Sequence, residues 1–231
     1  MAEHPDPRLE DESRLDKIKR VVEDVAHDAP PLAKIALEAM IRNHNPDLAG
    51  TAETAGRVGM RSGKVSELTA IAKLKPGGGE RLQRILALTK GNMDGAQRVS
   101  TLHDMRFVFF DDNTRILFAT TYDGDWDAYI NDFATKIPEL MDLLFQNVEG
   151  WPGIDSPSVK DFIAEHQMTA AGWFVANPQV TVVDVRRMQR TEHALNDFFD
   201  SMSGRDDLDP KTAEAMKKLT DAISTPEGVD Y

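Results

Sequence analysis

Three side chains near the middle of the sequence have the types needed for acid–base chemistry: His103, Arg106 and Asp123. A neutral imidazole can act as a general base or as a metal ligand near neutral pH. An arginine guanidinium can bind a carboxylate through its planar fork. We therefore treat these three residues as the candidate catalytic group. The alternative is a structural role, in which His103 is held by a hydrogen bond at a strand end and Arg106 pairs with Asp104 or Asp123.

Large aromatic side chains occur close to this group and farther along the chain, and such side chains can line an apolar pocket. We predict that four of them contact a ligand: Phe107, Tyr122, Trp126 and Trp173. Packing in a hydrophobic core is the competing explanation for aromatic residues, since most large aromatic side chains in proteins are largely buried.

The sequence predicts no metal site. Asp123, Asp125 and Asp127 alternate as in a calcium loop, but the twelfth position counted from Asp123 is Ala134 instead of glutamate. Asp125 is better suited to capping a helix, because its carboxylate can accept from backbone N–H groups of the first turn. Residues 77–79, Gly-Gly-Gly, stand where a phosphate loop would lie but lack the lysine and serine of that motif.

The candidate residues lie on a predicted β-hairpin. Residues 101–110 and 115–122 are rich in β-branched and aromatic side chains, and a turn cluster, Asp-Asp-Asn-Thr, separates them at residues 111–114. Side chains alternate between the two faces of a strand, which puts His103 and Arg106 on opposite faces unless a β-bulge intervenes.

Further predicted elements surround the hairpin. Apolar residues at spacings of three and four predict a helix over residues 126–144, which Pro138 interrupts or restarts. We also expect strands at residues 67–74 and 170–176 and a helix at residues 80–88. The resulting order, β-α-β-β-α-β, predicts an α+β fold of the ferredoxin-like sandwich type. In such a sandwich the helices cover one face of the sheet and leave the other face open.

The chain divides into four predicted parts. Residues 1–12 are charged and contain proline, which predicts a disordered leader. Residues 13–64 form an N-terminal helical extension that ends in a linker or weak helix at residues 47–64. Residues 65–200 form the ferredoxin-like α+β barrel domain and include an amphipathic final helix, and residues 201–231 form a polar acidic tail.

Composition limits the classes of function. The chain has 231 residues, a net charge of −12 and no compact basic stripe, so binding to nucleic acid or to an anionic membrane surface is disfavoured. The absence of cysteine excludes disulfides, thiolate catalysis and cysteine-ligated metals, and fits a reducing compartment. No apolar run approaches the ~20 residues of a membrane span, and the acidic start lacks the features of a signal peptide. We therefore expect a cytoplasmic protein.

The central and final segments resemble the dimeric α+β barrel superfamily, especially the peroxidase-like branch related to the dye-decolourising peroxidases. The similar segments are residues 100–103 with Arg106, 116–118, 122–129, 132–133, 173–176 and 181–187. Together they span roughly residues 65–200 of the chain. Residues 120–124 match the GxxDG motif of the dye-decolourising peroxidases except that Thr120 replaces the first glycine, and the proximal haem histidine has no identifiable counterpart.

The resemblance implies two ferredoxin-like sheets paired into a barrel, within one chain or between two. Because one such unit is visible here, it implies a homodimer, or a covering role for the N-terminal helices. Members of the superfamily include haem enzymes and cofactor-free oxygenases. We therefore expect a small-molecule-binding, oxidoreductase-like protein for an apolar or aromatic ligand, with His103, Arg106 and Asp123 nearest the reaction and haem as a cofactor that the resemblance allows. The alternative is a non-catalytic subunit that keeps the fold for dimerisation or for docking onto a larger enzyme.

Overall fold

The computed structural model describes residues 14–43, 53–88, 94–202 and 209–224 of the chain. The chain divides into two compact units, and the boundary between them in the sequence lies between Gln179 and Val180. The first unit contains a β-sheet and most of the described helices, and the described residues of the second unit form two helices. This mixed content confirms the predicted α+β class.

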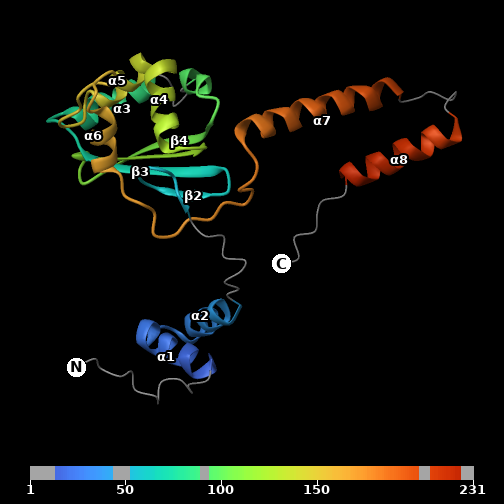
Figure 1. Ribbon diagram of the computed structural model, residues 1–231, viewed down its shortest axis with the longest axis horizontal. Helices are drawn as coiled ribbons and strands as arrows, with labels where there is room; N and C mark the ends of the chain where they lie inside the picture. The colour runs from blue at the N-terminus through green and yellow to red at the C-terminus, as the bar shows by residue number, and fades with distance from the viewer. Residues whose placement is uncertain (1–13, 44–52, 89–93, 203–208, 225–231) are drawn as a thin grey trace, which may run out of the picture. The chain divides into compact units, whose positions relative to one another are not determined.

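A five-stranded antiparallel sheet forms the centre of the first unit (Figure 1). Its strands are β1 (Glu53–Thr54), β2 (Met60–Ser62), β3 (Val65–Lys73), β4 (Leu102–Phe110) and β5 (Arg115–Asp123). They lie in the order β1-β2-β3-β5-β4, and each neighbouring pair is antiparallel. Because β5 lies between β3 and β4, the latter two strands run parallel to each other. The predicted hairpin and the strand before it are thereby confirmed.

Four helices lie on one side of this sheet, above it in Figure 1. They are α3 (Gly78–Leu88), α4 (Trp126–Lys136), α5 (Pro138–Phe145) and α6 (Val159–His166), and a short 3-10 helix, η2 (Asp94–Arg98), precedes β4. The hydrophobic core combines apolar side chains from the helices with those from one face of the sheet. Its buried members include Leu68, Leu82, Ile116, Phe118, Ile130, Phe133 and Met141.

The predicted helix over residues 126–144 divides at Pro138, as expected. Asp125 caps α4, because its Oδ1 atom accepts a hydrogen bond of 2.9 Å from the backbone N–H of Asp127. Pro138 is the first residue of α5. Proline is well tolerated there, since the N–H group that it lacks would have no partner in the first helical turn.

The prediction of a fourth strand at residues 170–176 was wrong. This segment forms no strand, and Phe174 within it is 87% exposed. The free edge of β3 is already occupied at two places, because β2 pairs with its first two residues and Gln167 forms an antiparallel bridge with Ala70. The backbone N–H of Ala170 turns instead to the Glu67 carboxylate. An apolar composition cannot make a strand where no edge is available.

The prediction of a linker or weak helix at residues 47–64 was also wrong for the described part. Residues 53–62 form the small hairpin of β1 and β2, and Gly56 and Gly59 in its turn have φ angles of +117° and +95°, which favour glycine. Ala55 is fully buried, and its carbonyl accepts from the Trp126 N–H at 2.8 Å. The hairpin is thus tied to the start of α4. Residues 47–52 lie outside the described residues.

Two helices precede the sheet in the chain, α1 (Arg14–Ala26) and α2 (Pro31–Asn43). They contact each other. Val22 of α1 is buried, whereas Leu32 and Met40 of α2 are 80% and 71% exposed. The predicted leader at residues 1–12 lies outside the described residues.

The second unit contains α7 (Val182–Met202) and α8 (Pro210–Ser224). The helix α7 forms where the sequence predicts a final helix before residue 200. The segment predicted as a polar acidic tail contains α8, whose described side chains are mostly exposed.

Candidate functional site

The face of the sheet that α3 to α6 leave uncovered can be assigned from strand register, because directly paired residues share a face. Ile71 pairs with Leu117, and Val108 pairs with the same Leu117 from the other side. We call this surface the outer face. Its residues are Val65, Glu67, Thr69, Ile71, Lys73, Asp104, Arg106, Val108, Phe110, Arg115, Leu117, Ala119, Thr121 and Asp123.

Four apolar side chains of the outer face lie outside the hydrophobic core, whereas Ala119 on the same face is only 2% exposed. Ile71, Val108, Phe110 and Leu117 are all absent from the buried cluster and from the side chains packed against it. Val108 is 48% exposed. The outer face therefore offers an apolar centre that helices α3 to α6 do not cover.

His103 and Asp123 form a close pair at one end of this face. The Nε2 atom of His103 lies 2.7 Å from Oδ1 of Asp123, and the two side chains are 24% and 9% exposed. An ionised carboxylate can only accept hydrogen bonds, so Nε2 carries the proton. In the neutral ring, Nδ1 is then left with a lone pair that can accept a proton. Asp123 thus fixes the tautomer and the orientation of the ring.

A β-bulge explains how His103 reaches this position. Leu102 pairs with Tyr122 and Asp104 pairs with Thr121, which leaves His103 as an extra residue without a partner in the ladder. Such a residue shifts the alternation of side chains by one position. The β-bulge that the sequence analysis allowed for is therefore present. Because of this bulge, His103 and Arg106 need not lie on opposite faces of β4.

Arg106 lies on the outer face two residues beyond Asp104, and its Nη1 atom donates to the Asp104 carboxylate. This is one of the pairings expected for a structural arginine. The Arg106 side chain is nevertheless 60% exposed. Arg106 pairs with Ala119 at the middle of β5, so the structure brings His103 and Asp123 together at one end of the outer face and places Arg106 on the same face nearer its centre.

The predicted ligand-binding residues lie elsewhere. Tyr122 and Trp126 are completely buried on the helix side of the sheet, and Trp126 donates from Nε1 to the Gln167 side chain at 2.7 Å. Phe107 packs against the aromatic rings of the same core. Trp173 is half-buried in the segment that follows α6. The structure does not bring these four residues together with the catalytic group.

Tyr122 and Tyr129 form a stacked pair inside the core. Their ring centroids are 3.8 Å apart and their planes differ by 4°. Burial raises the pKa of both phenols well above the ordinary value, and the charge of Glu67 adds to this effect at Tyr122. Neither hydroxyl has a hydrogen-bond partner of good geometry in the described part of the chain. Both phenols are therefore neutral at physiological pH, and neither can act as a base there.

Glu67 is a buried carboxylate that sequence reasoning missed. It is only 4% exposed and accepts from Met60 N–H at 3.1 Å, Thr69 Oγ1 at 3.0 Å and Ala170 N–H at 3.3 Å. A buried carboxylate with three donors is well satisfied. Its role is to hold β2 and the segment after α6 against β3. The sequence shows only a glutamate in a strand, so no local signal marks it.

A small apolar cavity lies between the sheet and the helices, on the side away from His103. Its volume is about 30 Å³, and apolar side chains such as Phe118, Phe145 and Trp151 line it. The exception is His166, whose Nδ1 atom lies 2.8 Å from the Phe162 carbonyl oxygen. A space of this size holds roughly one or two water-sized molecules. It cannot accept an aromatic ligand without rearrangement of the core.

The donor set does not fit a metal or a haem held by this chain alone. In the described residues, no group of three or more His, Asp or Glu side chains could hold a metal ion. Haem needs an axial ligand beside a pocket that surrounds the macrocycle. His103 is 24% exposed, and the largely apolar cavity between the sheet and the helices, of about 30 Å³, is far too small for a macrocycle.

Comparison with protein-family models, with curated proteins and with solved structures found no match to this chain. Among the described helices, none combines the length and the apolar character that crossing a membrane requires.

Proposed function

We propose that this chain is a small-molecule-binding protein of oxidoreductase-like type whose ligand lies on the outer face beside His103. The observation that carries this proposal is the 2.7 Å pair of His103 and Asp123 at the end of an apolar sheet surface. In this position the imidazole is oriented by a carboxylate and still accessible to a ligand.

The fold that we propose is the ferredoxin-like sandwich of the dimeric α+β barrel superfamily. Support comes from the order β3-β5-β4, in which a hairpin strand lies between two parallel strands joined through α3. The bridge between Gln167 and Ala70 lies at the edge where that fold has its fourth strand. A second copy of the chain would then close the barrel over the outer face.

The chemistry that this site can perform is proton abstraction. An elongated aromatic ligand would lie on Ile71, Val108 and Leu117 and extend along β5 by about four residues, roughly 13 Å, toward His103. There Nδ1 of His103 would accept a proton from a hydroxyl or acidic C–H group at that end of the ligand. The Arg106 guanidinium would stabilise the resulting anion. Such an anion is the electron-rich species that an oxygenase-type reaction with dioxygen would use.

Binding of an aromatic anion tests the proposal, with 1-anilinonaphthalene-8-sulfonate as the probe. Val108→Asp places a carboxylate in the centre of the outer face and should weaken fluorescence-detected binding by at least about tenfold, the equivalent of about 1.4 kcal/mol. Leu143→Asp is the matched control, because Leu143 is a similarly exposed apolar residue, at 43%, on α5. Circular dichroism verifies that both variants are folded. Equal binding by both variants and the unchanged protein would exclude the outer face as the site.

An absorption titration with haemin tests the haem form of the same proposal. If His103 acts as a base and the protein binds no haem, no Soret band should appear in this titration. A Soret band that disappears in His103→Ala would instead favour a haem enzyme, with a pocket completed by a second copy of the chain.

A second candidate function is a non-catalytic assembly subunit, and the charges of the outer face favour it. Lys73 and Arg115 lie at one end of the paired strands, whereas Asp104 and Asp123 lie at the other end. A second copy related by a two-fold axis would place opposite charges over each other around the apolar centre. For an assembly subunit, alanine at His103 and at Arg106 leaves cellular function unchanged while the protein stays folded. Loss of function in those variants would favour the catalytic proposal.

A further inference from the structure

The cavity of about 30 Å³ inside the first unit lies between the sheet and the helices that stand above it in Figure 1. We call this space the core cavity. Strands β3 and β5 provide one wall, through residues such as Leu68 and Ile116. Helices α4, α5 and α6 provide the other wall, through residues such as Ile130, Met141 and Ile163. These five side chains are all buried, so the core cavity is built into the hydrophobic core.

The lining of the core cavity offers very little to a polar molecule. Apart from His166, the residues that line it have apolar or aromatic side chains. The Phe162 carbonyl oxygen can only accept, so His166 Nδ1, 2.8 Å away, carries the proton and Nε2 of the neutral ring keeps a lone pair. The indole N–H of Trp151 already donates to the Asp142 carboxylate at 2.8 Å. A buried water needs about two to four polar partners, so the core cavity favours an apolar occupant.

Three aromatic rings on the solvent side give a route of entry. Trp151, Phe162 and His166 line the core cavity and are half-buried, whereas Leu68 and Phe133 are completely buried. The ring centroids of Trp151 and Phe162 are 5.6 Å apart, and those of Phe162 and His166 are 4.2 Å apart. Rotations of partly exposed side chains are much faster than unfolding. A small molecule can therefore enter through a limited movement of these rings, while the sheet stays intact.

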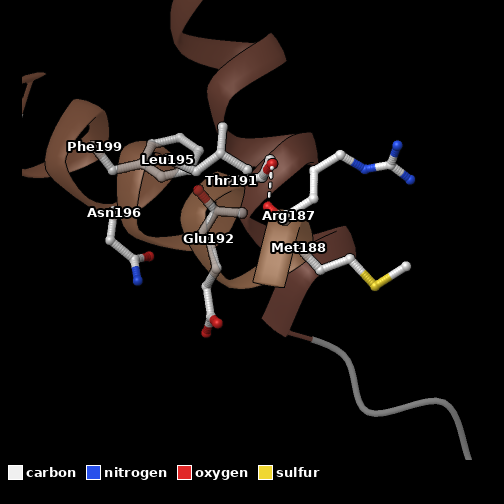
Figure 2. A pocket seen from close by; sticks show the side chains of 8 residues that line it. Arg187, Met188, Thr191, Glu192, Leu195, Asn196 and Phe199 are labelled. Carbon is white, nitrogen blue, oxygen red and sulfur yellow. Dashed lines mark hydrogen bonds between the residues drawn. The ribbon is translucent and has the colours of Figure 1, made fainter. Parts of the chain in front are cut away.

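The larger groove on α7 does not offer the same environment. Its volume is about 310 Å³, and it is open to solvent (Figure 2). The polar side chains of Thr191, Glu192 and Asn196 contribute to its lining. Because water can form hydrogen bonds with these groups, the groove does not select an apolar molecule. The core cavity does.

We propose that the core cavity binds a small apolar molecule of the size of dioxygen. Its volume of about 30 Å³ limits the occupant to about two or three non-hydrogen atoms. Apolar cavities in proteins take up small apolar molecules and xenon, because water gains few hydrogen bonds there. Among the small molecules available to a cell, dioxygen has this size and no polar group. The core cavity lies on the helix side of the sheet, opposite the outer face. The inference therefore goes beyond the proposed ligand site and does not depend on it.

Methyl NMR spectroscopy of the full chain under xenon pressure tests the proposal, with xenon as the probe. The methyl signals of Leu68, Ile116 and Ile130, which line the core cavity, should shift and then reach a plateau as the pressure rises. The signals of Ile71 and Val108 on the outer face should stay where they are. Shifts of equal size at Val108 would overturn the proposal. So would shifts at the lining methyl groups that rise linearly with pressure, because they would indicate solvent effects without a site.

Variants that change the volume of the core cavity give an independent readout. Ala72→Val should abolish the saturable shifts, because Ala72 is a buried residue of the lining and the added methyl groups fill the space. Met141→Ala enlarges the space and should raise the xenon association constant at least about threefold. Leu143→Ala is the matched control, since Leu143 lies on the same helix but is 43% exposed, and it should leave binding unchanged. Circular dichroism verifies folding, and Met141→Ala decides the question if Ala72→Val does not fold. Xenon binding that is the same in Met141→Ala as in the control would overturn the proposal.

Dioxygen is the second probe, because its paramagnetism speeds the relaxation of nearby methyl groups. Under dioxygen pressure, relaxation should increase more at Leu68 and Ile130 than at Val108, although Val108 is 48% exposed and they are buried. Nitrogen at the same pressure is the control. A larger increase at Val108 would overturn the proposal. Val108→Asp should leave the xenon shifts unchanged, and Met141→Ala should leave binding of 1-anilinonaphthalene-8-sulfonate unchanged, so this inference and the proposed function can fail separately.

Discussion

Alkaline pH should destabilise this protein in a way that depends on the stacked Tyr122–Tyr129 pair. Burial raises the pKa of both phenols above the value of about 10 that they have in the unfolded chain. The folded state therefore keeps two protons that the unfolded state releases as the pH rises above 10. The stability that these groups contribute is fully present below pH 10 and is lost progressively above it.

The size of the effect follows from the proton count. Each tyrosine that stays protonated only in the folded state lowers the free energy of unfolding by about 1.36 kcal/mol per pH unit. For the pair, the free energy of unfolding should fall by roughly 2 kcal/mol between pH 10 and pH 11, and the limiting slope above pH 11 is roughly 2.7 kcal/mol per pH unit. Tyr122→Phe should reduce this slope by about half. Because the Tyr122 hydroxyl has no well-formed hydrogen bond, the same variant should change stability at pH 7 by less than about 1 kcal/mol.

Urea unfolding followed by circular dichroism at pH 7, 10 and 11 measures these quantities. The double variant Tyr122→Phe/Tyr129→Phe is the control, and its slope should fall to whatever the other groups contribute. A single variant that keeps the full slope would refute the reasoning. So would a loss of more than about 2 kcal/mol at pH 7, because it would mean that the hydroxyl makes a strong hydrogen bond.

Three further substitutions test the packing and the caps. Phe118→Ala should lower the free energy of unfolding by about 3–5 kcal/mol, since its ring contacts three other aromatic rings in the core, and Leu143→Ala at an exposed position should cost less than about 1 kcal/mol by the same urea titration. Asp125→Ala should cost about 0.5–2 kcal/mol by removing the cap of α4, and Asp125→Asn should retain most of that stability. Gly63→Ala should cost more than about 1 kcal/mol in thermal unfolding, because Gly63 has a φ angle of +59° and an added Cβ would collide with the carbonyl of Pro178. A Gly63→Ala protein as stable as the unchanged chain would show that this close approach is not rigid.

The central hairpin and its neighbouring helices could be predicted because their signals are local. Alternating side chains specify β4 and β5, a turn cluster separates them, and Asp125 and Pro138 mark two helix starts. Each of these signals depends on residues a few positions apart. The tertiary contacts of these segments favour the same structure as the local signals do, so the elements form where the sequence predicts them.

The two wrong predictions concern the free edge of β3, where several segments compete. Whether residues 170–176 form a strand depends on which other segments already pair with β3. One of these segments is β2, far earlier in the chain, and the other is Gln167, which lies just before residues 170–176. The hairpin of β1 and β2 was missed because its strands are two and three residues long. Strands so short show no recognisable alternation.

The candidate site was predictable only in part for a similar reason. A histidine, an arginine and an aspartate could be chosen by type, but their common surface depends on the bulge at His103, which the sequence leaves open. Three of the four aromatic residues predicted to contact a ligand pack instead in the hydrophobic core beneath the helices. These three residues are Phe107, Tyr122 and Trp126. Period-2 alternation alone does not say which face of a strand helices will cover.

Methyl NMR spectroscopy offers the most direct test of the outer face as the functional surface. The probe 1-anilinonaphthalene-8-sulfonate is titrated into protein with labelled isoleucine, leucine and valine methyl groups. Shifts should be confined to Ile71, Val108 and Leu117, whereas Leu68 and Ile116, which point from the same strands into the core, should not move. Shifts at Leu68 and Ile116 with none at Val108 would contradict the account.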